Sequence, residues 1–596
     1  MLACRRNPTQ LRVRFGRADR QAAEEPLKRQ GYHYRVWRDG CLPVLLACLA
    51  FAGGSPLYAQ ARPIVDRLSP ETVFYLEWRG TASLAGAEQK NHLLQLLRDP
   101  AVAPMWLTLT SQIERSAPKG TGPVTALVVP DLISLLDNSV VFGVTTNPDA
   151  RKTSTPGRTI PQFATFLVYD LTGKTELVQK WRALATLSAK TPTEVTKYDF
   201  GGTWVEARTT RTGASYTAQA GSYLLISDQK KVIEDLITRF CGTDAGSPSV
   251  TGLPEYSQIR KYVGNDATLE FFGRMPDLSS WNASPGTKSI HLEKIHVLGG
   301  GLSFNGEAAR IRGAILGDAS PDGPFDLAGA SSAAFQTLPV VGTAPVFSVS
   351  RINLAAVYRL FIGAAVGNLP GQAAHVEASQ KAAESFLGMP IIDALQLFTG
   401  EIASMTTPSE DGTLEQLFAI SIQKPDAVLR VVRALTATMI VSEDSSGTTT
   451  YLDLAYPYED PRTHVRRRKF YYLAITPDTL LAAPRKTMLR QAVDRLGSGA
   501  TVGGSAGVFG SPELAQLRSR LPQRLSGLGA ADLSRIPWDT IFANLQNQAA
   551  LRASQANQKP PDLSWLKPEL LTRYLHFTLS GWWKDPNGVY FDSYIQ

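Results

Sequence analysis

The segment that most resembles a catalytic motif is Gly503–Gly507, which matches the G-x-S-x-G nucleophile elbow of α/β-hydrolases with Ser505 as the nucleophile. An elbow needs a strand before the serine and a helix after it, because the strained turn between them exposes the hydroxyl. Here the motif lies in a glycine-rich run between two predicted helices. A loop is therefore the favoured interpretation, and a hydrolase that uses Ser505 is the alternative.

Histidines are the second set of candidates. None of the six that follow residue 61 forms the H-E-x-x-H pattern of a zinc site. His296 and His576 occupy matching positions, each a few residues before an Asn-Gly turn in one half of the chain. If the halves pack about a pseudo-twofold axis, both imidazoles could converge on a ligand; in the alternative, each forms hydrogen bonds within its own sheet. We predict no metal and no other cofactor.

A run of cations is the third candidate. Arg466, Arg467 and Arg468 lie between His464 and Lys469. As a ligand-binding site, the run would contact an anionic partner such as a phospholipid head group or a cell-wall polymer. As a structural feature, it would be the solvated tip of a hairpin. Neither a Walker-type phosphate loop nor a dinucleotide fingerprint occurs in the sequence.

The elements that must position these residues recur in one order, about 260 residues apart. Residues 129–148 align without a gap to residues 389–408, and both read as an apolar helix that runs into a strand. Pro-Glu-x-x-Gln-[Ile/Leu]-Arg occurs at Pro254–Arg260 and again at Pro512–Arg518. Several matches in the same order predict an internal duplication.

Each half contains segments with the residue pattern of strands and segments with the spacing of helices. Residues 72–78, 163–169 and 295–304 are rich in β-branched and aromatic side chains, which is typical of strands. Residues 230–240 and 486–496 have helical spacing, and a glycine follows each of them as a stop signal. Alternating segments between these elements predict antiparallel meanders.

We therefore predict the α+β class, with two similar lobes that arose by internal duplication. Each lobe is expected to be a mainly antiparallel sheet with packed helices. The predicted boundaries are 62–318 for the first repeat, 319–342 for a linker rich in Ala, Ser, Gly and Pro, and 343–596 for the second repeat.

The first 61 residues are typical of a secretory signal peptide with a long basic n-region. They hold 10 of the 61 Lys and Arg residues but only 4 of the 53 Asp and Glu residues, so the net charge of +8 belongs mostly to the leader. The apolar run at 41–54 is shorter than the about 20 residues that span a bilayer, and Ala59-Gln60-Ala61 fits a cleavage site. Alternatively, Leu45–Cys48 resembles a lipobox, in which Cys48 would carry a lipid.

With these features in view, the chain resembles exported bacterial proteins that are grouped as a domain of unknown function. The resemblance is carried by residues 69–76, by the repeated helix–strand block and by the end of the 486–496 helix. It covers most of residues 66–596 and implies an exported, two-lobed α+β protein. It transfers no catalytic residue.

The predicted function is that of an exported cell-envelope protein, periplasmic or extracellular, with a non-catalytic binding or structural role. Two alternatives stay open: a carrier of lipid or another apolar ligand, suggested by aromatic residues such as Trp582 and Phe271, and an envelope hydrolase. The expected partner is an envelope protein, a polymer or a lipid. Since most of the net positive charge lies in the leader, we expect no nucleic acid as a partner. We also expect no transmembrane span in the mature chain.

Overall fold

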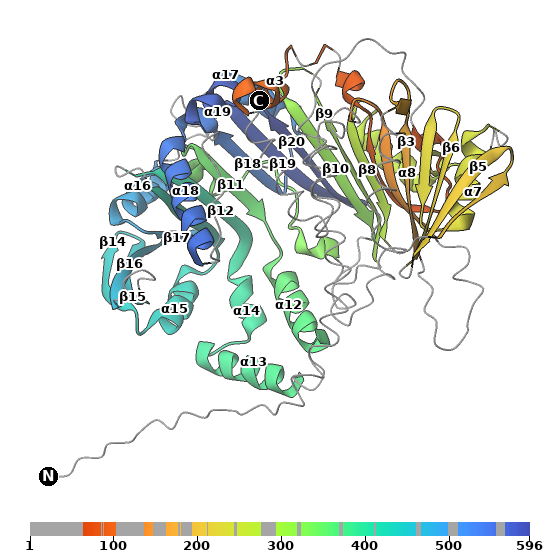
Figure 1. Cartoon of the computed structure of the whole chain (residues 1–596). Helices are drawn as coiled ribbons and strands as arrows, with labels where there is room; N and C mark the ends of the chain where they lie inside the picture. Colours follow the sequence, from red (N-terminus) through yellow and green to blue (C-terminus); the bar gives the residue numbers. More distant parts are fainter. Residues whose placement is uncertain are drawn as a thin grey trace.

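The computed structural model describes most of the chain from Ile64 onward (Figure 1). The described residues are 64–84, 86–87, 89–102, 136–146, 163–176, 179, 194–210, 213–242, 247–275, 294–304, 306–318, 324–368, 373–409, 413–459, 466–498, 511–555 and 567–596. The predicted leader with Cys48 and the serine motif at 503–507 lie outside the described residues.

Within the described part of the chain, twenty strands form one antiparallel sheet. Ten of these strands come from the first half of the sequence. In spatial order they are β4 (Glu194–Phe200), β5 (Thr203–Thr210), β6 (Gly213–Ala220), β7 (Tyr223–Ser227), β3 (Phe163–Asp170), β2 (Val140–Thr146), β1 (Thr72–Trp78), β8 (Leu269–Arg274), β9 (Ile295–Ser303) and β10 (Ala309–Gly317).

The sheet continues without a break into the second half of the chain (Figure 1). Its remaining strands, again in spatial order, are β20 (Gly588–Ile595), β19 (Phe577–Asp585), β18 (Gly527–Asp532), β11 (Val346–Arg351), β12 (Phe398–Pro408), β13 (Leu414–Ile422), β17 (Thr479–Ala483), β16 (Arg466–Ile475), β15 (Thr449–Glu459) and β14 (Ile440–Ser446).

The junction of the halves is the antiparallel pair β10–β20, which extends from Ala309 opposite Ile595 to Leu316 opposite Gly588. The prediction of two separate lobes is therefore wrong, because the chain forms one large sheet. The physical reason lies in the edges. Each half ends in a strand that would otherwise present a row of unpaired N–H and C=O groups, and pairing β10 with β20 satisfies both rows.

Counted outward from this junction, the two halves follow the same strand order: β9, β8, β1 and β2 on one side match β19, β18, β11 and β12 on the other. Because β10 and β20 are antiparallel, a local twofold axis perpendicular to the sheet relates them. An internal repeat would produce this arrangement, although the duplication itself stays a prediction.

Helices cover parts of the sheet and extend below it (Figure 1). Helix α7 contacts β6 and β7, α8 contacts β9 and β10, α16 contacts β16 and β17, and α17 contacts β19. The α-helices are α3 (His92–Arg98), α7 (Lys230–Phe240), α8 (Pro254–Val263), α11 (Leu338–Val341), α12 (Leu354–Asn368), α13 (Ala373–Leu387), α14 (Ile391–Gln396), α15 (Pro425–Thr436), α16 (Lys486–Gly497), α17 (Pro512–Arg520), α18 (Trp538–Gln555) and α19 (Pro568–Tyr574). Short 3-10 turns are η2 (Ile64–Arg67), η3 (Thr81–Leu84), η4 (Pro100–Val102), η5 (Val250–Gly252), η8 (Pro324–Leu327) and η10 (Leu533–Arg535).

Among the described helices, none combines the length and the apolar character that crossing a bilayer requires.

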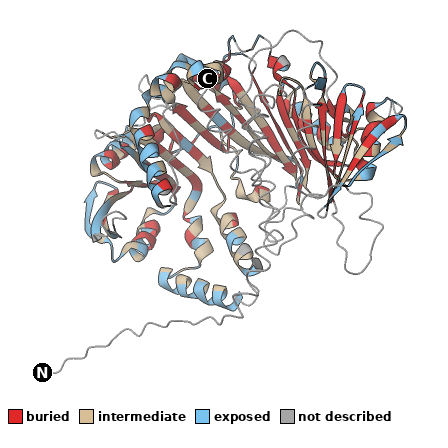
Figure 2. Cartoon of the chain, in the orientation of Figure 1, coloured by how far each residue is buried: buried red, intermediate tan, exposed pale blue. Residues whose placement is uncertain are grey.

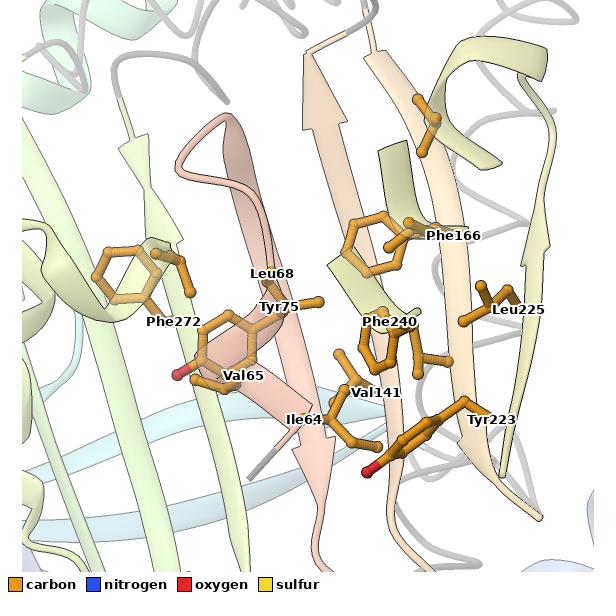
Figure 3. Close-up of a cluster of buried hydrophobic side chains, with 14 of the residues drawn as sticks. Ile64, Val65, Leu68, Tyr75, Val141, Phe166, Tyr223, Leu225, Phe240 and Phe272 are labelled. Carbon is orange, nitrogen blue, oxygen red and sulfur yellow. The ribbon is translucent and has the colours of Figure 1, made fainter. Parts of the chain in front are cut away.

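Apolar side chains are buried where the helices meet the sheet. In the first half, Tyr75, Phe166 and Phe240 belong to one buried cluster, which joins strands to α7 (Figure 3). Burial is unequal along the sheet (Figure 2). Strand β1 is buried throughout, whereas β4 and β14 are mostly exposed and α13 has no buried residue.

Most of the predicted linker packs against the second half. The described residues 324–342 contain four buried apolar side chains, Phe325, Phe335, Val340 and Val341. Isolated β-bridges connect Ala328 to Ile352 and Ser332 to Leu525. These contacts fix the path of the chain between β10 and β11.

Cross-strand pairs of glycine and an aromatic residue recur in the sheet. Gly143 faces Phe166, Gly300 faces Phe271, Gly313 faces Phe591 and Gly527 faces Trp582. At each of these glycines, an added Cβ would come closer to the partner ring than van der Waals contact allows. The missing side chain therefore lets the ring lie against the neighbouring backbone.

We expect Gly313→Ala to destabilise the junction, because its methyl group would overlap the ring of Phe591. Overpacking of this kind costs about 1–3 kcal/mol, which urea unfolding would detect. The matched control is Gly213→Ala in β6, where nothing lies within 4 Å of the added Cβ. Equal stability of the two variants would contradict the packing described for Phe591.

Candidate functional site

The two predicted histidines lie at opposite ends of the strands. His296 is half exposed near the start of β9, where its Nε2 lies 3.3 Å from Asp318 Oδ2. His576 precedes β19, and its backbone N–H donates to the carbonyl of Gln596, the residue after β20. Because β9 and β19 run in opposite directions across the junction, their first residues are separated by the strand length, about 30 Å for nine residues. The structure therefore does not bring His296 and His576 together.

Instead, His576 meets His92, the first residue of α3. The ring centroids lie 5.5 Å apart in an edge-to-face arrangement. Nearby, Tyr574 in α19 donates a 2.8 Å hydrogen bond to Asp99, so this contact also joins the two halves. Burial, followed by the charge of His576, lowers the pKa of His92, while Glu307 acts in the opposite direction. Nδ1 of His92 is buried and has no hydrogen-bond partner among the described residues.

The arginine run begins β16. Arg467 and Arg468 are exposed there and lie opposite Tyr458 and Pro457 of β15. Arg466 is part of the same strand, but its side chain lies outside the described atoms. The backbone thus places the run at the end of the β15–β16 hairpin where the two strands are connected. Its role in binding an anion stays a prediction.

A third polar group is a closed ion-pair cluster at the centre of the first half. Glu77 in β1 lies opposite Glu270 in β8, and the residues are 0% and 2% exposed. Arg79 Nη2 donates to Glu270 at 2.9 Å and its Nε to Glu77 at 3.2 Å. Arg260 of α8 also pairs with Glu270, and the Tyr75 hydroxyl donates to Glu270 at 2.7 Å.

The electrostatics of this cluster are those of a buried structural group. Burial raises the pKa of Glu77, although the adjacent Arg79 opposes the shift. Two arginines balance two carboxylates, as buried charges require. Since α8 covers the pair, a substrate would reach these carboxylates only if the helix moved away. Paired carboxylates alone therefore do not make this cluster an active site.

A cleft of about 910 Å³ lies in the second half of the described chain. Its lining includes residues where the chain passes from β11 into α12 and from α14 into β12. In the view of Figure 1, these connections lie below the two strands. The β19–β20 turn and the segment that precedes β11 close its other side. Its lining residues are Asp326, Ala328, Gly329, Ala330, Ser331, Ile352, Asn353, Leu354, Ala355, Leu395, Gln396, Phe398, Thr399, Gly400, Arg524, Lys584, Asp585 and Pro586.

The two cations of this cleft contact backbone carbonyls rather than acids. Arg524 Nη2 donates to the carbonyl of Ser331 at 3.4 Å. Lys584 Nζ donates to the carbonyl of Ala328 at 3.4 Å. The described residues place no carboxylate within ion-pair distance of either cation. Both charges are therefore available to an anionic ligand.

The two acids of the cleft already have partners. Asp326 forms an ion pair with Arg359 of α12, at 3.4 Å. Asp585 accepts hydrogen bonds from the backbone N–H groups of Asn587 and Gly588, at 2.7 and 3.1 Å, and so stabilises the β19–β20 turn. These interactions offset the two negative charges of the cleft, while Arg524 and Lys584 have no carboxylate partner among the described residues.

At the corresponding end of β1 in the first half, the described polar side chains contact one another or the backbone. Thr81 donates to Asp137 at 3.0 Å, and Lys174 pairs with the same carboxylate at 2.9 Å. Trp78 Nε1 donates to the carbonyl of Leu136 at 2.7 Å. Here the cation has a carboxylate partner, unlike the two cations of the cleft, which have none among the described residues.

The sequence hypotheses did not include Arg524 or Lys584. The two residues are far apart in the chain and belong to no motif. The pairing of β18 with β19 brings their segments together, with Gly527 opposite Trp582, and Ser331 contacts both residues. Lys584 lies close to a predicted Asn-Gly turn, and this position was the one indication in the sequence that it could line a site. No spacing rule would have linked it to the arginine.

Comparisons with known proteins found no matching family model, no matching curated protein and no matching solved structure. Across the described residues, no group of three or more His, Cys, Asp or Glu side chains is arranged to hold a metal ion.

A pH titration of stability tests the histidine contact between the halves. A lowered pKa in the folded state means that folding opposes protonation of His92. The stability that the neutral ring contributes is therefore present above the unfolded pKa, about 6.5, and is lost as the pH falls below it. We expect His92→Gln to reduce the loss of stability between pH 7.5 and pH 5.5.

Chemical denaturation at both pH values gives the slope of the unfolding free energy against pH. The matched control is His375→Gln in the exposed helix α13, which should keep the wild-type slope. If His92→Gln loses as much stability as the wild type between the two pH values, the imidazole of His92 does not couple folding to protonation.

Proposed function

We propose that the protein is an exported cell-envelope protein that binds an anionic ligand in the cleft beneath β11 and β12, without catalysing its conversion. The observation that carries this proposal is the pair Arg524 and Lys584, which line the cleft and, among the described residues, contact backbone carbonyls without a carboxylate partner. A cation without a carboxylate partner gains a charge-assisted hydrogen bond when a phosphate or carboxylate enters.

The sequence supports export independently of the cleft. Residues 1–61 combine a basic stretch, an apolar run and the Ala59–Ala61 pattern of a cleavage site. Anionic lipids and polymers are available to a protein that is delivered to the envelope. Either source would provide the charged oxygen atoms that Arg524 and Lys584 can bind.

The construction of the cleft favours binding over a purely structural role. Its walls come from the segment before β11, from α12 and α14, and from the β19–β20 turn. Several of these are fixed by hydrogen bonds, such as that of Ser331 Oγ to the carbonyl of Lys584 at 3.0 Å. A site whose walls are already held in place loses little entropy when a ligand binds.

Isothermal titration calorimetry of the purified protein with octyl phosphate tests this function. We expect binding in the wild type and an affinity at least about tenfold lower in the double variant Arg524→Gln/Lys584→Gln, since a hydrogen bond to a charged group contributes about 1.5–3 kcal/mol.

The control removes the same number of charges elsewhere. Arg467→Gln/Arg468→Gln alters the exposed run on β16 and should leave the affinity unchanged. The opposite pattern, with loss in this control and not in the cleft variant, would assign the anion to the arginine run and overturn the proposed site. Absence of any binding would also count against the proposal.

A further inference from the structure

Helix α12 has an unusual surface for an exposed helix. Between Leu354 and Val366 its only charged residue is Arg359. Helices that are apolar on all sides are normally buried. Within the described side chains of α12, however, only Ala356 is buried, and Phe361 is 74% exposed. This helix therefore presents an apolar surface that the described part of the chain covers only in part, and Phe361 is the most exposed of its described apolar side chains.

This surface is continuous with the cleft. Leu354, the first residue of α12, lines the cleft. Phe361 follows seven residues later and thus lies on the same helix face, about 10 Å further along the axis at 1.5 Å per residue. Val357 shares this face by its spacing of three residues. The apolar stripe Leu354–Val357–Phe361 therefore leads out of the cleft along the helix.

The lining of the cleft combines apolar and cationic side chains. Ile352, Leu395 and Phe398 provide apolar surface near the start of α12 and the end of α14. Arg524 and Lys584 contact the carbonyls of Ser331 and Ala328 in the segment that precedes β11. A ligand that satisfies both kinds of residue must carry both a charge and hydrocarbon.

We propose that the cleft holds a single-chain amphipathic anion, with its phosphate or carboxylate head between Arg524 and Lys584 and its alkyl chain along the stripe Leu354–Val357–Phe361. The inference rests on the proposed function and specifies the class of ligand. Charge complementarity selects the head group, and the partly exposed apolar stripe that begins at the cleft selects an alkyl tail. An alkyl chain fits because it needs a continuous apolar track and no hydrogen-bonding groups.

The chain length of the ligand tests the tail directly. Titration with inorganic phosphate, butyl phosphate and octyl phosphate should give affinities that rise in this order. Each buried methylene contributes about 0.8 kcal/mol, so two added methylenes should increase the affinity by about tenfold. Equal affinities for inorganic phosphate and octyl phosphate would overturn the alkyl-chain assignment.

A pair of surface variants locates the tail. Phe361→Ser should lower the affinity for octyl phosphate by about tenfold, the amount that two buried methylenes provide, and leave the affinity for inorganic phosphate unchanged. Phe386→Ser, at a 62% exposed phenylalanine on α13, is the control and should change neither affinity. Because both rings are exposed, both variants should keep the wild-type thermal transition. Normal octyl phosphate binding by Phe361→Ser would contradict the proposed track.

The outcomes separate this inference from the function on which it rests. If phosphate and octyl phosphate bind equally and Arg524→Gln/Lys584→Gln weakens both, the cleft binds anions but the alkyl assignment fails. If neither compound binds, the proposed function is wrong, and the inference that rests on it is wrong as well. If the wild type is a dimer that Phe361→Ser dissociates, and octyl phosphate does not bind, the stripe is an interface between two copies and the inference is overturned.

Discussion

The pairing of β10 with β20 is the interaction on which the rest of the structure depends. Opposite charges reinforce it, since Arg310 donates to both oxygens of Asp592, at 3.0 and 2.6 Å. Asp592 is buried, and the Tyr594 hydroxyl donates to the same carboxylate at 3.2 Å. A buried carboxylate is stable only when such partners are present. From α8, Tyr262 adds a hydrogen bond to the backbone of Phe591, so a helix of the first half also holds a strand of the second.

This junction also determines where the cleft can form. Because β20 is aligned on β10, the β19–β20 turn lies beside the segment that leaves β10 and enters β11. Ser331 in that segment exchanges hydrogen bonds with the backbone of Lys584, and Ser526 donates to the carbonyl of Gly329 at 2.9 Å. The cationic residues are thus held by the segment between β10 and β11, which lies beside the β19–β20 turn. The largest apolar side chains of the cleft come from α12, α14 and the adjoining Ile352 and Phe398.

Local periodicity predicted individual elements well, whereas the contacts between distant elements could not be read from the sequence. Strand β1 and helix α7 begin and end at the predicted residues, because alternation and helical spacing depend only on near neighbours. The continuous sheet depends on which edge strands pair with each other. An edge strand has the same side-chain pattern whether another strand pairs with it or a helix or loop covers it. For the same reason, no local pattern shows that Glu77 lies opposite Glu270 in a buried cluster. Arg524 and Lys584 meet through backbone contacts that no motif encodes.

The central claim is that the two halves form one sheet through β10 and β20, and backbone hydrogen exchange tests it most directly. Strand amides at an open edge exchange quickly, while amides paired on both sides are protected. The account predicts that residues 309–316 and 588–595 exchange as slowly as the neighbouring strands β9 and β19, and much more slowly than the edge strands β4 and β14. Exchange in β10 and β20 as fast as in β4 and β14 would show that the halves are not joined.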